Sequence, residues 1–239
     1  MQEKQRILDA AQEWFRESIA SNHVKNTRKL VDPNKFNINP FLLVYLSNFL
    51  TGNSRPESLA KALVYPRVLG TSITTSFGTN VQNFTSTVLS SFGSTTSGID
   101  IEFIDQIDGA KKYCQLKSGP NTINRDDVET IAGHFRGAIN LARTNNIRIG
   151  IDDLVVGVIY GEPNELSGHY KRITNDYHHP IIIGQSFWHR LTGDEDFYFD
   201  LIKSISQVAI ESNFEYELDV VIEQLSSSDY ITELYEQLD

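Results

Sequence analysis

The sequence predicts an α/β protein in which a central mixed sheet lies between helices, with further helices at both ends of the chain. Three observations carry this prediction. Residues 99–117 read as two strands joined by a turn. Residues 154–160 form a continuous apolar run, typical of a buried central strand. Residues 125–144 have the apolar spacing of a helix that can connect the two.

The 239 residues suffice for one ordinary hydrophobic core, and we expect a single domain over 1–239. Within it we expect a helical N-terminal region (1–65), a core (78–185) and acidic C-terminal helices (186–239). The single cysteine excludes an internal disulfide and a cysteine-rich zinc site. No apolar run approaches a membrane span of about 20 residues and the N-terminus lacks a secretion signal, so we expect a cytoplasmic protein without a membrane partner.

The net charge of −10 is unevenly distributed. Residues 194–239 contain 13 acidic residues and one basic residue, whereas residues 1–193 contain 18 acidic and 20 basic residues. An acidic chain is an unusual partner for nucleic acid, but the nearly neutral remainder can carry a local basic face. The charge therefore does not exclude a protein that binds DNA.

The N-terminal region is expected to be helical, with one interruption. We predict an amphipathic helix over 1–22 and a loop over 23–40, where prolines, asparagines and basic residues gather. A helix is expected over 41–50, and another from Pro56 to about Pro66, because proline opens a helix well and interrupts one. After the polar stretch 71–79, a helix should bury Val81, Phe84, Val88, Leu89 and Phe92.

The hairpin is the most informative stretch. Ile99, Ile101 and Phe103 alternate with Asp100 and Glu102, and Asp108-Gly109 is a good turn dipeptide. On the second strand Tyr113, Gln115 and Lys117 share one face. Pairing would bring Asp100, Glu102, Gln115 and Lys117 to one end of the sheet. Such polar groups make a poor core but a good site for a divalent metal beside a phosphate.

The remaining elements follow from caps and apolar runs. Asn124 is a good N-cap for the helix 125–144, with Asp126 and Asp127 in its first turn. We predict short strands over 147–151 and 180–184, and final helices over 196–211 and 214–238. The aromatic segment 187–198 is interpreted mainly as core packing and a helix start.

Asp100 followed by Gln115-x-Lys117 resembles the signature of the PD-(D/E)XK nuclease superfamily. The longer stretches 97–103 and 115–122, with the Gly119-Pro120-Asn121 loop, resemble a group of type II restriction endonucleases within it. This resemblance implies a restriction-endonuclease-like fold that hydrolyses double-stranded DNA with Mg²⁺ at a specific palindromic site, and a cognate DNA methyltransferase. The superfamily usually has Glu or Asp where this chain has Gln115.

The resemblance also assigns roles. Asp100, Gln115 and Lys117 are the candidate catalytic residues, and Asp100, Gln115 and the backbone carbonyl of Leu116 are the candidate Mg²⁺ ligands. Lys117 would position water and stabilise charge on the phosphate. Glu102 and Gln82 are candidates for supporting the site, since Gly78 to Gln82 resembles an element whose last residue is usually an acid. The candidate DNA contacts are Ser118, Asn121, Thr122, Asn124 and Arg136.

We expect a homodimer, because two-fold symmetry lets two such sites cut both strands of a palindrome. The apolar surface of residues 1–65 and 187–198 also exceeds what a small sheet core requires. A catalytically weak or inactive DNA-binding relative stays open, since Gln115 and Gln82 replace expected acids, and so does a DNA repair nuclease of the same fold. The sequence contains no Walker A, G-x-S-x-G or G-x-G-x-x-G motif.

Overall fold

The computed structural model describes residues 2–211 and 214–238, without the side chains of residues 2, 78, 79, 81, 82, 85 and 86. The chain divides into two compact units. The sheet unit comprises residues 1–11 and 81–204, and the helical unit comprises residues 12–80 and 205–239. None of the described helices is both long and apolar enough to cross a membrane.

The sheet unit is built on a four-stranded mixed sheet in the order β1-β2-β3-β4. The strands are β1 (Ile101–Ile104), β2 (Lys111–Lys117), β3 (Leu154–Val158) and β4 (Ile181–Ile183). The pairs β2–β3 and β3–β4 are parallel, and β1–β2 is the antiparallel hairpin predicted from the sequence. Its turn contains Gly109 in the left-handed region, at φ 71°. The α/β class with a mixed sheet is thereby confirmed.

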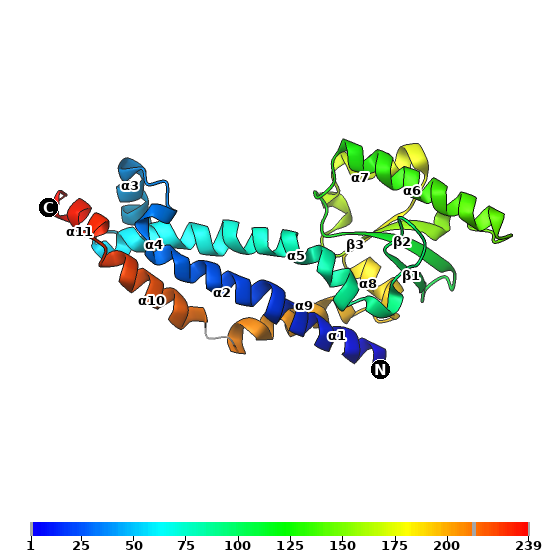
Figure 1. Ribbon diagram of the computed structural model, residues 1–239, viewed down its shortest axis with the longest axis horizontal. Coiled ribbons are helices and arrows are strands. Elements are labelled where there is room, and N and C mark those ends of the chain that lie inside the picture. Colours follow the sequence, from blue (N-terminus) through cyan, green and yellow to red (C-terminus); the bar gives the residue numbers. More distant parts are fainter. Residues whose placement is uncertain (1, 212–213, 239) are drawn as a thin grey trace. The chain divides into compact units, whose positions relative to one another are not determined.

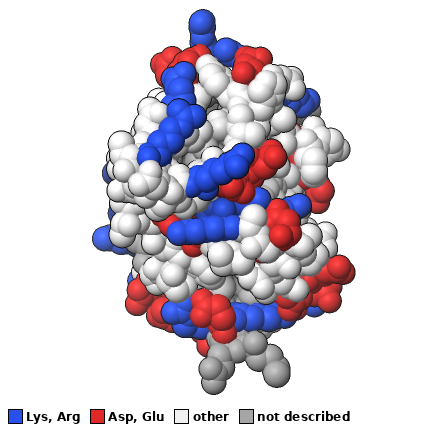
Figure 2. Space-filling model, turned by 90° about the vertical axis from the view of Figure 1, so that its right-hand side faces the viewer, with Lys and Arg blue, Asp and Glu red and all other residues white. Residues whose placement is uncertain are grey.

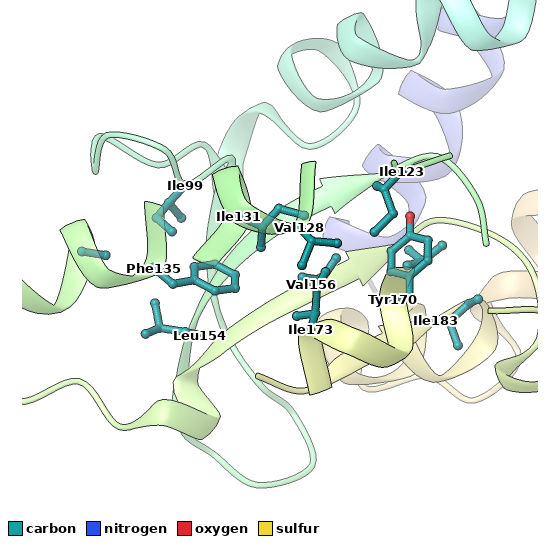
Figure 3. Packing of buried hydrophobic residues seen from close by; sticks show 12 residues of the cluster. Ile99, Ile123, Val128, Ile131, Phe135, Leu154, Val156, Tyr170, Ile173 and Ile183 are labelled. Carbon is teal, nitrogen blue, oxygen red and sulfur yellow. The ribbon is translucent and has the colours of Figure 1, made fainter. Parts of the chain in front are cut away.

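Helices cover both faces of the sheet (Figure 1). One face packs against α6 (Arg125–Thr144) and α7 (Gly168–Tyr177), and the other packs against α8 (Gln185–Thr192). Figure 3 shows the first interface, where Ile131 and Phe135 of α6 meet Leu154 and Val156 of β3. Phe135 is fully buried, and burying such a side chain contributes about 1.5–3 kcal/mol.

The hairpin is anchored to α8 by charge. Asp105 is fully buried at the end of β1, and its carboxylate accepts a hydrogen bond of 2.5 Å from Arg190. Arg190 also lies 3.5 Å from Asp108 in the turn. The aromatic segment is core as expected, because Phe187, Trp188 and Phe197 are all fully buried. These contacts hold the strands that carry the candidate site.

The helical unit contains helix at several places where the sequence indicated a loop. Its helices, some shared with the sheet unit, are α1 (Gln2–Trp14), α2 (Ser21–Thr27), α3 (Pro40–Thr51), α4 (Pro56–Pro66), α5 (Ile73–Thr87), α9 (Phe197–Glu211), α10 (Phe214–Ser226) and α11 (Asp229–Glu236). The boundaries between the two units fall within α1, α5 and α9. A core of α4 and α10 side chains, among them Val64, Val221 and Leu225, holds this unit together.

Two local predictions were wrong. The loop expected over 23–40 is helical as far as Lys35, through α2 and two 3₁₀ turns, because Leu30 packs into the α4–α10 core. Helix α4 ends at Pro66 as predicted, but the chain does not leave the helical course: a π-helical turn, Arg67–Ser72, follows and leads into α5. The polar stretch 71–79 is therefore helical as well.

Two later expectations also fail. Residues 147–151 form no strand, because Asn146 has a φ of 55° and the N–H of Ile147 closes the end of α6 by donating to Ala142. The helix expected over 214–238 is broken at Ser227 and Ser228. Their hydroxyls donate to carbonyls of the preceding turn, which competes with helix continuation.

Candidate active site

The hairpin register places Asp100 directly beside Gln115. The N–H of Asp100 donates to the carbonyl of Cys114 at 3.0 Å, one residue before β1 pairs regularly with β2. Its carboxylate is exposed and accepts a hydrogen bond of 2.7 Å from the N–H of Leu116 through Oδ2. This bond fixes the side chain over the end of β2 and leaves Oδ1 as the oxygen available to a ligand.

Gln115 is buried, at 5% exposure, and its amide orientation is defined by its partners. The amide nitrogen donates to the carbonyl of Gly98 and lies 2.6 Å from Nδ1 of His134. Because a backbone carbonyl only accepts, the nitrogen must face Gly98. The side-chain oxygen therefore remains for a ligand, and Nδ1 of His134 is the acceptor for the second hydrogen of the amide.

Gly98 permits this arrangement in two ways. It has a φ of 77°, which favours glycine, and a Cβ at this position would lie 2.5 Å from Cγ of His134. Any larger residue would push His134 away from Gln115. The sequence analysis identified neither Gly98 nor His134 as a site residue, although His134 lies within the helix that it predicted.

Asp100, Gln115 and Lys117 line one small pocket of about 190 Å³. Its other lining residues come from the start of the hairpin and from α6: Gly98, Ile99, Asp127, Thr130, Ile131 and His134. Asp127, Thr130 and His134 were missed by the sequence analysis. Their spacing of three and four residues on one helix is the signal that could have found them.

Lys117 ends β2 and is half-buried. Its carbonyl accepts a hydrogen bond of 3.0 Å from Ile159, which extends the pairing between β2 and β3 beyond the strand ends. Within the part of the chain that the structure describes, no carboxylate forms an ion pair with its ammonium group. That cation is therefore free to meet a phosphate.

Glu102 shares a strand face with Asp100 but does not line the pocket. Ser94 and Thr96 donate to its carboxylate at 2.5 and 2.9 Å, and the Lys111 ammonium lies 2.7 Å away. Partial burial acts to raise the pKa of Glu102, but the hydrogen bonds from Lys111, Ser94 and Thr96 outweigh it and hold the pKa below its ordinary value. The Glu102 carboxylate is thus ionised, and its bonds to Ser94, Thr96 and Lys111 keep it from serving the candidate metal site.

The loop after β2 is tied to α7. Tyr170 is fully buried, and its hydroxyl donates to the carbonyl of Gly119 at 2.9 Å. Burial raises the pKa of Tyr170 to about 12. Thr122 donates to the same carbonyl, also at 2.9 Å, and Asn124 caps α6 in a reciprocal pair with Asp127. These residues shape the loop beside the pocket.

The other sequence candidates lie outside the pocket. Ser118 is half-buried and Asn121 is exposed in the same loop, and Arg136 is exposed on α6. Gln82 belongs to α5, but its side chain lies outside the described residues. The structure therefore brings together three of the candidates, Asp100, Gln115 and Lys117, and places the rest around them or elsewhere.

The oxygen atoms at this site fit a hard divalent cation such as Mg²⁺. Asp100 offers Oδ1 and Gln115 offers its amide oxygen, and the carbonyl of Leu116 belongs to the next residue of β2, whose N–H donates to Asp100. The set is weak in charge, because only Asp100 is an acid among these three. The described residues contain no group of three or more His, Cys, Asp or Glu side chains suited to a metal ion.

The family model described as type II restriction endonuclease EcoO109I matches residues 39–213, which include the whole hairpin, the pocket and α6. No curated protein sequence matches the chain significantly.

Proposed function

The chain belongs to the type II restriction endonuclease EcoO109I family, and from this premise we propose that it hydrolyses phosphodiester bonds of double-stranded DNA at a specific site, using Mg²⁺ in the pocket of Asp100, Gln115 and Lys117. The observation that carries the proposal is the convergence of these three side chains in one pocket. A carboxylate, a neutral amide oxygen and an unpaired ammonium group suit a phosphate and its counter-cation.

Each side chain has a task in this proposal. Asp100, Gln115 and the carbonyl of Leu116 would hold the cation, which when bound supplies neutralisation of charge on the phosphate. Lys117 would hydrogen-bond the attacking water and stabilise the negative charge that builds up at phosphorus. His134 and Gly98 would act as positioning residues, because both accept from the Gln115 amide and so aim its oxygen.

We further propose that the protein acts as a homodimer on a palindromic site. The support is α3, whose exposed face carries a continuous apolar stripe: Phe41, Leu42, Tyr45, Leu46, Phe49 and Leu50, each more than 40% exposed. The opposite face of the same helix is buried through Leu43. A helix that is apolar on all sides is usually buried on all sides. Because α3 leaves one apolar side exposed, we propose that a second copy of the chain covers this stripe. The aromatic segment 187–198 is core and contributes little to such an interface.

The test is cleavage of supercoiled plasmid with Mg²⁺, followed by sequencing of the ends. Discrete fragments with one terminal sequence support the proposal, and that sequence gives the recognition site and stagger. Asp100→Asn keeps an acceptor for Leu116 but removes the charge, so we expect cleavage to fall by orders of magnitude with folding retained. Lys117→Ala should do the same. Wild-type cleavage rates in both variants would place the active site elsewhere.

One alternative stays open because Gln115 replaces the usual acid. The chain would then be a DNA-binding relative that cuts slowly or not at all. A shift of DNA mobility without cleavage at any Mg²⁺ or Mn²⁺ concentration supports this alternative. A DNA repair nuclease of the same fold would instead cut damaged or mismatched DNA without a fixed terminal sequence.

A further inference from the structure

A second, larger pocket lies wholly within the helical unit. Its volume is about 480 Å³, compared with about 190 Å³ for the candidate active site. The lining comes from α2, the 3₁₀ turns that follow it, the π-helical turn and α5: Asn22, Asn26, Lys29, Leu30, Lys35, Arg67, Thr71, Ser72, Thr75, Ser76 and Asn80. Leu30 is the single apolar side chain in this set.

The pocket concentrates positive charge in an acidic protein. Lys29, Lys35 and Arg67 all contribute to its wall, and no acidic residue is among the described lining residues. On the face shown in Figure 2, by contrast, lysine and arginine are interspersed with aspartate and glutamate. The chain has a net charge of −10, so a cluster of three cations around one pocket is unusual. The cations repel each other, and a bound anion would relieve this repulsion.

Among the residues that the structure describes, these cations form no ion pair. Arg28, which precedes Lys29, is bound to Glu217, but Lys29 donates only to the neutral side chain of Asn26, at 3.1 Å. Lys35 and Arg67 are exposed, and the described part of the chain provides neither with an acidic partner. Their charges are therefore available to a ligand.

The unexpected helical geometry creates this site. Because residues 28–35 fold into two 3₁₀ turns instead of a loop, Lys29 and Lys35 are brought to one wall. Because a π turn follows Pro66 in place of a loop, Arg67, Thr71 and Ser72 line the same pocket. Single π turns within helices are frequent at functional sites.

The lining chemistry favours an extended polyanion over a small molecule. Sites for small molecules are mostly apolar and enclose the ligand. Here every lining residue except Leu30 carries a polar or charged group, and the cations are long side chains, accompanied by hydroxyl and amide groups. Lys, Arg, Ser, Thr and Asn side chains are those that contact phosphate oxygens of DNA.

We propose that this pocket binds phosphate groups of the DNA backbone, as a contact separate from the active-site pocket. This inference rests on the proposed function, since it gives the helical unit a role in holding the same substrate. The contact would be independent of base sequence and would add affinity through Lys35 and Arg67. Neutralising two phosphates releases their condensed counterions, so the contribution depends strongly on salt.

The test compares two double variants. The pocket variant is Lys35→Gln with Arg67→Gln, and the matched control is Lys25→Gln with Arg55→Gln. The control removes one lysine and one arginine that are exposed in the same unit but lie outside the pocket. Binding of duplex DNA is measured by fluorescence anisotropy over a range of salt concentrations, with EDTA present so that nothing is cut.

For the pocket variant we expect the slope of log K against log[salt] to fall by about two, which weakens binding roughly 60-fold at about 0.1 M salt. The control should keep the wild-type slope, and thermal melting should show both variants folded. Equal losses of DNA affinity in the two variants would overturn the inference, because the loss would then reflect the net charge of the protein and not the pocket. An unchanged slope in the pocket variant would overturn it too.

Two further results separate the possible failures. If calorimetry shows that inorganic phosphate binds the wild type and not the pocket variant while DNA affinity is unchanged, the pocket is a small-anion site and the inference is overturned. If the wild type cuts plasmid at discrete sites but the pocket variant binds DNA normally, only the inference fails. A wild type that neither binds nor cuts DNA overturns the proposed function itself.

Discussion

Replacing Gln115 by glutamate would place an acceptor where the structure requires a donor. The amide nitrogen of Gln115 donates to the Gly98 carbonyl and to Nδ1 of His134, and the side chain is only 5% exposed. A carboxylate would turn a lone pair towards the Gly98 carbonyl. An unmade buried hydrogen bond costs about 1–3 kcal/mol, so we expect Gln115→Glu to lower the stability of the metal-free protein by about 2 kcal/mol.

Metal should offset most of this loss of stability if Gln115 contributes a ligand oxygen. A carboxylate binds a divalent cation more tightly than an amide oxygen does, and a tenfold gain in affinity recovers about 1.4 kcal/mol at saturating metal. For a chain of this size, a loss of about 2 kcal/mol corresponds to a fall in Tm of about 4–8 °C. The variant should also need less Mg²⁺ for cleavage than the wild type.

The assay is thermal unfolding with EDTA and with saturating Mg²⁺, for the wild type, Gln115→Glu and Gln115→Ala. The alanine variant loses the same hydrogen bonds but gains no charge, so its Tm should rise less with Mg²⁺ than that of the wild type. Gln115→Glu should show the largest rise. Equal rises in all three proteins would refute the reasoning, because Gln115 would then not touch the metal.

Three further predictions test the surroundings of the site. Tyr170→Phe removes the buried hydroxyl bonded to the Gly119 carbonyl and should cost about 1–2 kcal/mol in denaturant unfolding; an unchanged midpoint would contradict this. Gly98→Ala forces a Cβ onto His134 at a φ of 77°, so we expect a loss of more than about 1 kcal/mol and slower cleavage, and normal values of both would argue against a positioning role. Because the folded pKa of Glu102 is lowered, its stabilisation is present above its unfolded pKa of about 4.5 and is lost as pH falls through the folded value. The Tm of the wild type should therefore fall more steeply than that of Glu102→Gln between about pH 6 and pH 3, and parallel curves would refute this.

Local patterns determined the part of the sheet unit that carries the hairpin and α6. The alternation through residues 99–117, the Asn124 cap and the apolar stripe of 125–144 all act within a few residues of each other. Such signals depend on the period of one strand or one helix and on a capping side chain. The sequence by itself therefore indicated the hairpin, its turn, the helix and the strand within 154–160 close to where they lie.

Only the tertiary structure decided which side chains meet. Gln115 bonds to Gly98 and His134, which lie 17 and 19 residues away along the chain, and the orientation of its amide depends on both. The helical course of residues 23–35 and the π turn after Pro66 likewise depend on packing against α4 and α10. Neither the periodicity nor the composition of a segment contains its distant partners. The sequence therefore pointed to Asp100, Gln115 and Lys117. Only the fold added His134 to the site and assembled the pocket of Lys29, Lys35 and Arg67, because packing between distant segments determines which residues meet.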